Sequence, residues 1–211
     1  MNHITEKVLL TPETCEVFKE ALFASRLYWL DRGSFYTLGA SAYIDDPCVY
    51  PGLAANCNGI LEQRFKYLSS LVANWLKEEF NREVIVFPNK GLPGFHIFTS
   101  ESNGHEASIH TDEAHDRLVW GCEVADAFSF TLVIDLPKCG GGLNWWKNQA
   151  DADNEMLLPT HQPYTVGTAY LFAADVPHQI ANDGDLGDDE YRITYQGHGV
   201  TLDTGKIAVY F

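Results

Sequence analysis

Basic residues are scarce in this chain. Its 211 residues include 14 lysines and arginines against 29 aspartates and glutamates, which gives a formal net charge of −15. Nucleic acids and anionic membrane surfaces are bound through clustered Lys and Arg side chains, so this charge argues against both as the main partner. We therefore expect a small-molecule substrate, and the acidic balance leaves room for a cationic or zwitterionic one. The oligomeric state is left open.

Paired cysteines and long apolar runs are also lacking. The cysteines are odd in number and widely spaced, which argues against a disulfide framework or a zinc site; they are Cys15, Cys48, Cys57, Cys122 and Cys139. No run of about 18 apolar residues is present, so no membrane-spanning helix is expected. The first residues contain Glu6 and Lys7 and no long apolar core, so we expect no signal peptide and a cytoplasmic protein with reduced thiols.

The first 92 residues predict helical and mixed structure that supports the rest of the chain. Thr11 followed by Pro12 is a typical helix start, and apolar residues recur at helical spacing after it. A second apolar stripe predicts a helix from Gly59 to Phe80, with its apolar face against a sheet. Between the two helices, a strand is expected at 35–38, followed by a loop rich in Asp and Pro around 45–52.

Residues 93–211 predict the core of the domain, and short strands dominate the chain from residue 84 onward. Strand-like runs occupy 84–87, 94–99, 106–112, 117–124, 128–136, 142–146, 164–172, 177–181, 191–197 and 206–210. Many short strands separated by turn residues are typical of a sandwich or jelly roll. At 211 residues the chain is long enough for one domain, so we expect a single mainly-β domain at 1–211. Its fold would be a double-stranded β-helix (jelly roll, cupin-like) with N-terminal supporting helices.

Two histidines and an aspartate have the pattern of a metal site. Side chains two residues apart on a strand point the same way, so an extended 106–112 would aim His110 and Asp112 at one point. His178 would then arrive from a facing strand. Two histidines and one carboxylate form the ligand set of non-heme Fe(II) oxygenases, which leaves open positions on the metal. A His-x-Asp pair also occurs by chance on protein surfaces, so both interpretations remain open on these residues alone.

Arg192 and Thr194 add a candidate anion site. They are two residues apart on a predicted strand, so they share one face. A guanidinium offers a planar pair of donors to a carboxylate, and a hydroxyl beside it can donate as well. The pair suits a second carboxylate ligand such as a 2-oxo acid. The alternative is a surface arginine on an edge strand.

Five segments carry a likeness to a known superfamily. They are 94–98 (Gly-Phe-His-Ile-Phe), 139–146 (Cys-Gly-Gly-Gly-Leu-Asn-Trp-Trp), 166–172 (Val-Gly-Thr-Ala-Tyr-Leu-Phe), 176–178 (Val-Pro-His) and 191–199 (Tyr-Arg-Ile-Thr-Tyr-Gln-Gly-His-Gly). With the His110–Asp112 pair, they make residues 93–200 resemble the Fe(II)/2-oxoglutarate-dependent oxygenase superfamily, closest in pattern to its prolyl-4-hydroxylase-like branch. The interval from His178 to Arg192 is longer than is common there, and we interpret 182–190 as a loop insertion.

The resemblance implies roles for individual residues. His110, Asp112 and His178 would bind Fe(II), and Arg192 with Thr194 would hold the distal carboxylate of 2-oxoglutarate. Thr99 would also touch this cosubstrate, although a Tyr is common near that position and Phe98-Thr99 stands here. O2 would be the second cosubstrate.

Four further residues are candidates for contact with the substrate: Trp120, Trp146, His115 and Asp175. Each has a plainer alternative, namely core packing for the tryptophans and a loop or solvent position for the other two. Asp175 is also a candidate acceptor that orients His178. His105 is expected to face away from the metal ligands, and His96 and His198 are expected in the core or beside the ligands.

These features predict an Fe(II)- and 2-oxoglutarate-dependent dioxygenase. The expected reaction is hydroxylation of an unactivated C–H bond of a small molecule, such as a free or carrier-tethered amino acid. One alternative is a peptidyl (prolyl-type) hydroxylase. From another class, the alternative is a cupin-like metal-binding or sensor protein without turnover, which would have no need of the Arg192 carboxylate site.

Overall fold

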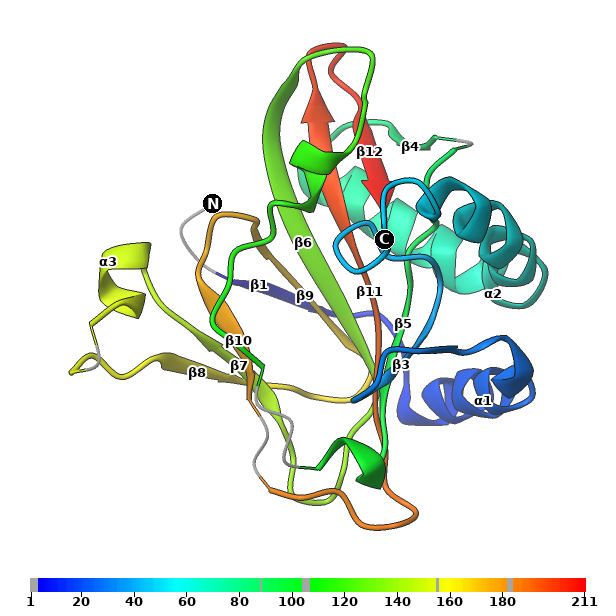
Figure 1. The fold of residues 1–211 in the computed structure, drawn as a ribbon, viewed down its shortest axis with the longest axis vertical. Helices are drawn as coiled ribbons and strands as arrows, with labels where there is room; N and C mark the ends of the chain where they lie inside the picture. Colours follow the sequence, from blue (N-terminus) through cyan, green and yellow to red (C-terminus); the bar gives the residue numbers. More distant parts are fainter. Residues whose placement is uncertain (1–3, 88, 104–106, 155, 182–183) are drawn as a thin grey trace.

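The computed structural model describes residues 4–87, 89–103, 107–154, 156–181 and 184–211. Two antiparallel-rich sheets face each other, and the two long helices cover the outer side of the larger sheet (Figure 1). The strands are β1 (Thr5–Val8), β2 (Leu30–Asp31), β3 (Tyr36–Leu38), β4 (Val84–Val86), β5 (Gly94–Phe98), β6 (Val124–Asp135), β7 (Gly142–Trp145), β8 (Thr160–Pro163), β9 (Thr168–Ala173), β10 (His178–Ala181), β11 (Arg192–Leu202) and β12 (Ile207–Tyr210). The predicted jelly roll is confirmed.

The larger sheet has nine strands and the smaller one three. The order in the larger sheet is β1-β9-β6-β11-β5-β3-β2, and β12 joins it by pairing with both β11 and β4. The smaller sheet has the order β10-β7-β8. Strands β1 to β4 come from the first 92 residues, so this part of the chain adds edges to the same sheet as well as the helices. The single-domain organisation stays a prediction.

Helix α1 (Pro12–Phe23) begins where the sequence predicts. The Thr11 side chain accepts a hydrogen bond from the Thr14 backbone N–H, and Pro12 takes the first helical position, where its missing N–H costs nothing. Helix α2 (Tyr50–Phe80) begins earlier than the predicted Gly59. Pro51 and Gly52 were expected in a loop, but both lie in the first turn, where proline is tolerated. The predicted apolar stripe of α2 is buried against the sheet.

Two predicted strands are wrong. The segment 117–124 instead contains the end of a 3-10 helix, η3 (Ala114–Arg117), and an irregular loop, and β6 starts only at Val124. Gly121 has a φ of 73°, which a regular strand does not adopt. The described part of 106–112 is irregular apart from one bridge, between His110 and His178. Strand β8 was not foreseen at its position, because its residues show no apolar alternation.

The main core lies between the helices and the larger sheet. Leu61, Phe65 and Leu68 of α2 pack with Phe95 and Leu132, and all five side chains are fully buried. This packing leaves the other face of the larger sheet, toward β7 and β10, for the cavity described below. No helix within the described residues combines the length and apolarity that a membrane crossing needs.

Candidate metal centre and cosubstrate cavity

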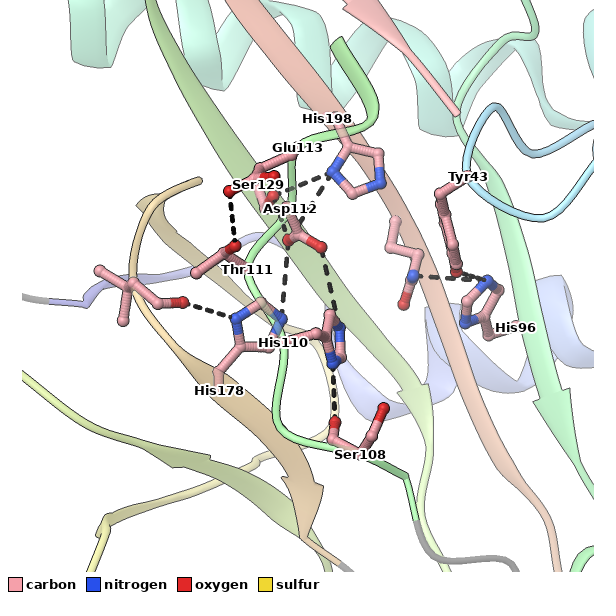
Figure 2. Close-up of polar contacts among 12 residues, drawn as sticks. Tyr43, His96, Ser108, His110, Thr111, Asp112, Glu113, Ser129, His178 and His198 are labelled. Atoms are coloured by element: carbon pink, nitrogen blue, oxygen red, sulfur yellow. Dashed lines mark hydrogen bonds and ion pairs between the residues drawn. The ribbon is translucent and has the colours of Figure 1, made fainter. Parts of the chain in front are cut away.

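Three predicted ligand residues meet at one point between the sheets. His110 and His178 form a two-way backbone bridge, with N···O distances of 3.0 and 2.9 Å, and the Asp112 N–H donates to the Ala174 carbonyl at 2.8 Å. Although the segment is not a strand, these contacts bring the His110, Asp112 and His178 side chains together, as Figure 2 shows. One nitrogen or oxygen from each lies within 4.8 Å of the others, so the group can hold a metal ion.

Both histidines present the form that binds metals. Nδ1 of His110 lies 2.8 Å from the Ser108 carbonyl, and Nδ1 of His178 lies 2.8 Å from the Val176 carbonyl. Because a carbonyl only accepts, each Nδ1 carries a proton, so Nε2 is the atom of each ring that can coordinate a metal. The two Nε2 atoms lie 3.8 Å and 3.6 Å from the Asp112 carboxylate. Burial lowers the pKa of His178, which keeps its imidazole neutral and able to coordinate.

Asp112 is held in place by residues from the larger sheet. The Ser129 hydroxyl of β6 donates to Asp112 Oδ2 at 2.5 Å, and His198 Nδ1 of β11 lies 3.8 Å from the same oxygen. Burial by itself would raise the pKa of Asp112, but His178, His198 and the Ser129 hydrogen bond together lower it. The carboxylate therefore stays ionised at neutral pH. Sequence reasoning missed Ser129, which carries no motif of its own.

Arg192 and Thr194 line the same cavity as the three ligand residues. The cavity has a volume of about 320 Å³ and lies between β5, β6 and β11 on one side and β7 and β10 on the other. Arg192 is 3% exposed and donates to the carbonyls of Ala181 at 2.6 Å and Gly142 at 2.8 Å. Its guanidinium also lies 5.4 Å from the Tyr164 ring centroid. A buried cation near the metal ligands can pair with a carboxylate.

Comparison with known proteins places this geometry in a known fold. No family model and no curated protein matches the sequence. Solved structures do match, at 11% identity. The non-heme α-ketoglutarate-dependent epimerase SnoN of nogalamycin biosynthesis has a TM-score of 0.58, over 93% of this chain and 77% of SnoN. An N-substituted L-amino acid dioxygenase from Burkholderia ambifaria AMMD has a TM-score of 0.56, over 99% of this chain and 86% of that one.

A third structure was solved with both a metal and a cosubstrate. HygX from Streptomyces hygroscopicus, with nickel and 2-oxoglutarate bound, matches with a TM-score of 0.53 and 11% identity, over 92% of this chain and 82% of HygX. The chain has the fold of the 2-oxoglutarate-dependent oxygenases. The resemblance drawn from the sequence motifs is confirmed for the fold.

Several predicted residues lie away from the cavity of this oxygenase fold. Thr99 does not line it, because its Oγ1 accepts from the Glu101 N–H and caps a 3-10 helix, η2 (Ser100–Ser102). Trp120 is a core residue that packs on Phe87 and Tyr210. Trp146 is also buried outside the cavity, where its indole N–H donates to the Leu157 carbonyl at 3.4 Å.

The two polar candidates for substrate contact are displaced as well. His115 lies in η3, where its Nε2 is 3.4 Å from the neighbouring Asp116, and it does not line the cavity. Asp175 is exposed in the turn before β10. The acceptor that orients His178 is the Val176 carbonyl and not the Asp175 carboxylate. His105 lies outside the described residues.

The cavity wall contains polar residues that sequence reasoning did not assign to a site. Ser129 and Thr131 come from β6, Tyr43 and Tyr164 from loops, and Gln196 from β11. Gln196 had a usable signal. It continues the alternation that starts with Arg192 and Thr194 and ends with His198, so these side chains share one face of a strand. No sequence signal placed Tyr43 and Tyr164 in the cavity, because loop residues follow no periodicity.

Proposed function

We propose that this protein is an Fe(II)- and 2-oxoglutarate-dependent dioxygenase that hydroxylates a C–H bond of a small molecule. The observation that carries the proposal is the convergence of His110, Asp112 and His178 on a cavity that also contains the buried Arg192. A metal-binding protein without turnover would need the first three residues and not the fourth.

The donor set fits Fe(II). Two neutral imidazoles and one ionised carboxylate form the facial arrangement of non-heme iron oxygenases, with further positions left for cosubstrate and O2. His110 and His178 would bind through Nε2, since each Nδ1 donates to a backbone carbonyl. Ser129 would hold one oxygen of Asp112 and so favour coordination through the other. Bound Fe(II), with 2-oxoglutarate and O2, supplies the oxidising chemistry that puts one oxygen atom into a C–H bond while the cosubstrate becomes succinate and CO2.

Arg192 would bind the distal carboxylate of 2-oxoglutarate. Arg192 is buried in the cavity wall, which favours a charge-assisted contact with an anion. At a buried site, water screens the attraction between the two charges only weakly. Thr194 lines the cavity two residues along the same strand; its hydroxyl donates to Gln196 Oε1 at 3.0 Å and would turn from it to donate to the cosubstrate. Tyr164, whose ring lies beside the guanidinium, would cover this end from solvent.

Asp112 favours hydroxylation over halogenation. A carboxylate ligand occupies the coordination position that a halide would need, and its negative charge opposes a second anion. With Asp112 in this role, the bound metal would supply oxygenation rather than halide transfer.

For the substrate we propose a free or carrier-tethered amino acid. The cavity suits a small molecule, and one structure of the same fold is named as an N-substituted L-amino acid dioxygenase.

Succinate release tests the function. Purified protein with Fe(II), 2-oxoglutarate and O2 should release succinate, and a panel of amino acids, peptides and carrier-bound thioesters should yield a product heavier by one oxygen atom. Protein that binds neither Fe(II) nor 2-oxoglutarate would contradict the proposal.

A further inference from the structure

A cluster of uncharged polar side chains lies on the cavity wall beside the candidate metal centre. Tyr43 Oη lies 2.7 Å from His96 Nε2, and Gln196 Nε2 lies 3.5 Å from the same nitrogen, as Figure 2 shows for the labelled pair. The Thr194 hydroxyl donates to Gln196 Oε1 at 3.0 Å, which turns the amide nitrogen toward His96. His96 Nε2 is therefore the acceptor, and its single lone pair takes the Tyr43 hydroxyl, with the 3.5 Å Gln196 contact as a weak second one. The Tyr43 ring packs against His198, 5.6 Å between centroids, which places the cluster next to Asp112.

This arrangement leaves one donor and one acceptor that can face a ligand. The phenol oxygen of Tyr43 keeps acceptor capacity after it donates, which it shares with the Ser41 hydroxyl, and the amide of Gln196 has a second N–H. A hydroxyl or a primary carboxamide both donates and accepts, so one such group satisfies both residues. A methyl or an aromatic edge satisfies neither.

The cluster is uncharged at neutral pH. Burial lowers the pKa of His96 to about 3 and raises the pKa of Tyr43. Among the described residues that line the cavity, the ionised ones are Asp112 and Arg192, which the proposed function assigns to iron and to 2-oxoglutarate. A charged substrate group would lose its water here without gaining an opposite charge, so its binding is penalised.

Apolar rings complete the surroundings of the cluster. Phe35 and Phe98 stack with centroids 5.0 Å apart at 18°, and Phe35 lies 5.1 Å from the His96 ring. Both phenylalanines line the cavity. They offer a surface for hydrocarbon directly beside the polar groups.

Tyr43 also borders a neighbouring hollow. It lines this second, more polar hollow together with His110 and Asp112, and that hollow includes Glu113, outside the main cavity. Charged parts of a larger substrate can remain in this second hollow, which Glu113, Asp116 and Arg117 line.

We propose that Tyr43, His96 and Gln196 form the substrate-recognition subsite, and that it takes an uncharged hydroxyl or carboxamide attached to a compact hydrocarbon, such as a ring. The inference rests on the proposed function, because it assigns the remaining charges of the cavity to metal and cosubstrate. If the substrate is an amino acid, its ammonium and carboxylate must stay in the second hollow or be covalently modified to uncharged groups.

Ligands that share one ring and differ in one group test the subsite. We would measure dissociation constants of benzyl alcohol, benzamide, toluene, benzoate and benzylammonium by ligand-observed NMR, with protein saturated with diamagnetic Zn(II) and 2-oxoglutarate, so that Asp112 and Arg192 are already paired. The same series would be run on Tyr43→Phe and Gln196→Leu, which remove the polar atoms and nearly keep the shape. Tyr67→Phe is the matched control, since Tyr67 is an exposed helix residue. Thermal unfolding would verify that each variant is folded.

Benzyl alcohol and benzamide should bind at least about ten-fold more tightly than the two ions, because an unpaired ion is penalised. Each subsite variant should weaken binding of the alcohol about two- to ten-fold, as expected for one neutral hydrogen bond, and leave toluene unchanged. Equal binding of either ion, an unaltered alcohol preference in both variants, or no binding of any of the five would overturn the subsite. Binding of Zn(II) and of 2-oxoglutarate is measured beforehand and the assay needs no turnover, so its failure is separate from a failure of those two sites or a failure to release succinate.

Discussion

Replacing Arg192 with alanine should weaken both the fold and the binding of 2-oxoglutarate. The guanidinium donates to the carbonyls of Ala181, at the end of β10, and Gly142, at the start of β7. A buried acceptor that loses its partner costs about 1–3 kcal/mol. With two such acceptors, the free energy of unfolding of the protein without cosubstrate should fall by roughly 2–6 kcal/mol. Backbone hydrogen bonds that these carbonyls keep make this loss smaller.

The effect on the cosubstrate has its own magnitude. Charge-assisted hydrogen bonds contribute about 1.5–3 kcal/mol, so the dissociation constant of 2-oxoglutarate should rise roughly ten- to a hundred-fold in Arg192→Ala. Arg192→Lys keeps the charge and loses the planar fork, and it should fall between the wild type and the alanine variant. Arg82→Ala is the control, because Arg82 is an exposed arginine just beyond the end of α2.

The assay is calorimetric titration of 2-oxoglutarate into anaerobic Fe(II)-loaded protein, paired with denaturant unfolding of each variant. The two measurements separate the roles of the guanidinium. If folded Arg192→Ala binds 2-oxoglutarate as tightly as the wild type, Arg192 only ties β7 and β10 to β11, and the proposed cosubstrate site is refuted.

Four further predictions concern the metal ligands and the cavity. His178→Ala should abolish Fe(II) binding and succinate release with an unchanged circular dichroism spectrum, and retained activity would contradict the ligand assignment. Ser129→Ala should weaken Fe(II) binding about ten- to a hundred-fold in a competition titration, because it frees the Asp112 carboxylate to turn; unaltered affinity would show that the hydrogen bond is dispensable. The pKa of His96 is about 3 in the fold against 6.5 as its ordinary value, so the unfolded chain binds the proton first. Stability of the metal-free protein should therefore fall as pH drops from 6.5 toward 3, by up to about 1.4 kcal/mol per pH unit from this group, and His96→Gln should flatten that slope in denaturant titrations. With Asp112 in place, product mass spectrometry in excess chloride should show added oxygen, and a chlorinated product would refute the hydroxylase proposal.

The sequence was sufficient to predict features that depend on short-range patterns. The Thr11-Pro12 start of α1 follows from capping chemistry, and the apolar stripe of α2 follows from helical periodicity. The convergence of His110, Asp112 and His178 was also predicted, although for a partly wrong reason. The segment is not a strand; it is aligned by a bridge to His178 and a hydrogen bond to the Ala174 carbonyl.

Features that depend on long-range packing were not accessible. Trp120 and Trp146 were candidates for the substrate pocket because aromatic side chains suit both a pocket and a core, and periodicity does not separate the two. In the fold, each fills a buried space elsewhere. Tyr43 reaches the cavity from a loop that lies 53 residues before His96 along the chain. Only the sheet register that sets β5 beside β3 brings them together.

Strand β11 explains why core and site depend on each other. Its side chains alternate, so Ile193 and Tyr195 are fully buried toward the helices, where the Tyr195 hydroxyl lies 2.9 Å from the Ser69 hydroxyl of α2. Arg192, Thr194 and Gln196 point to the cavity on the opposite face. A slip of one residue would bury the polar set in the core and turn the apolar set into the cavity, so the packing of α2 fixes the register that positions the site. Substitutions in that core, far from any bound ligand, should therefore alter the cavity before they unfold the chain.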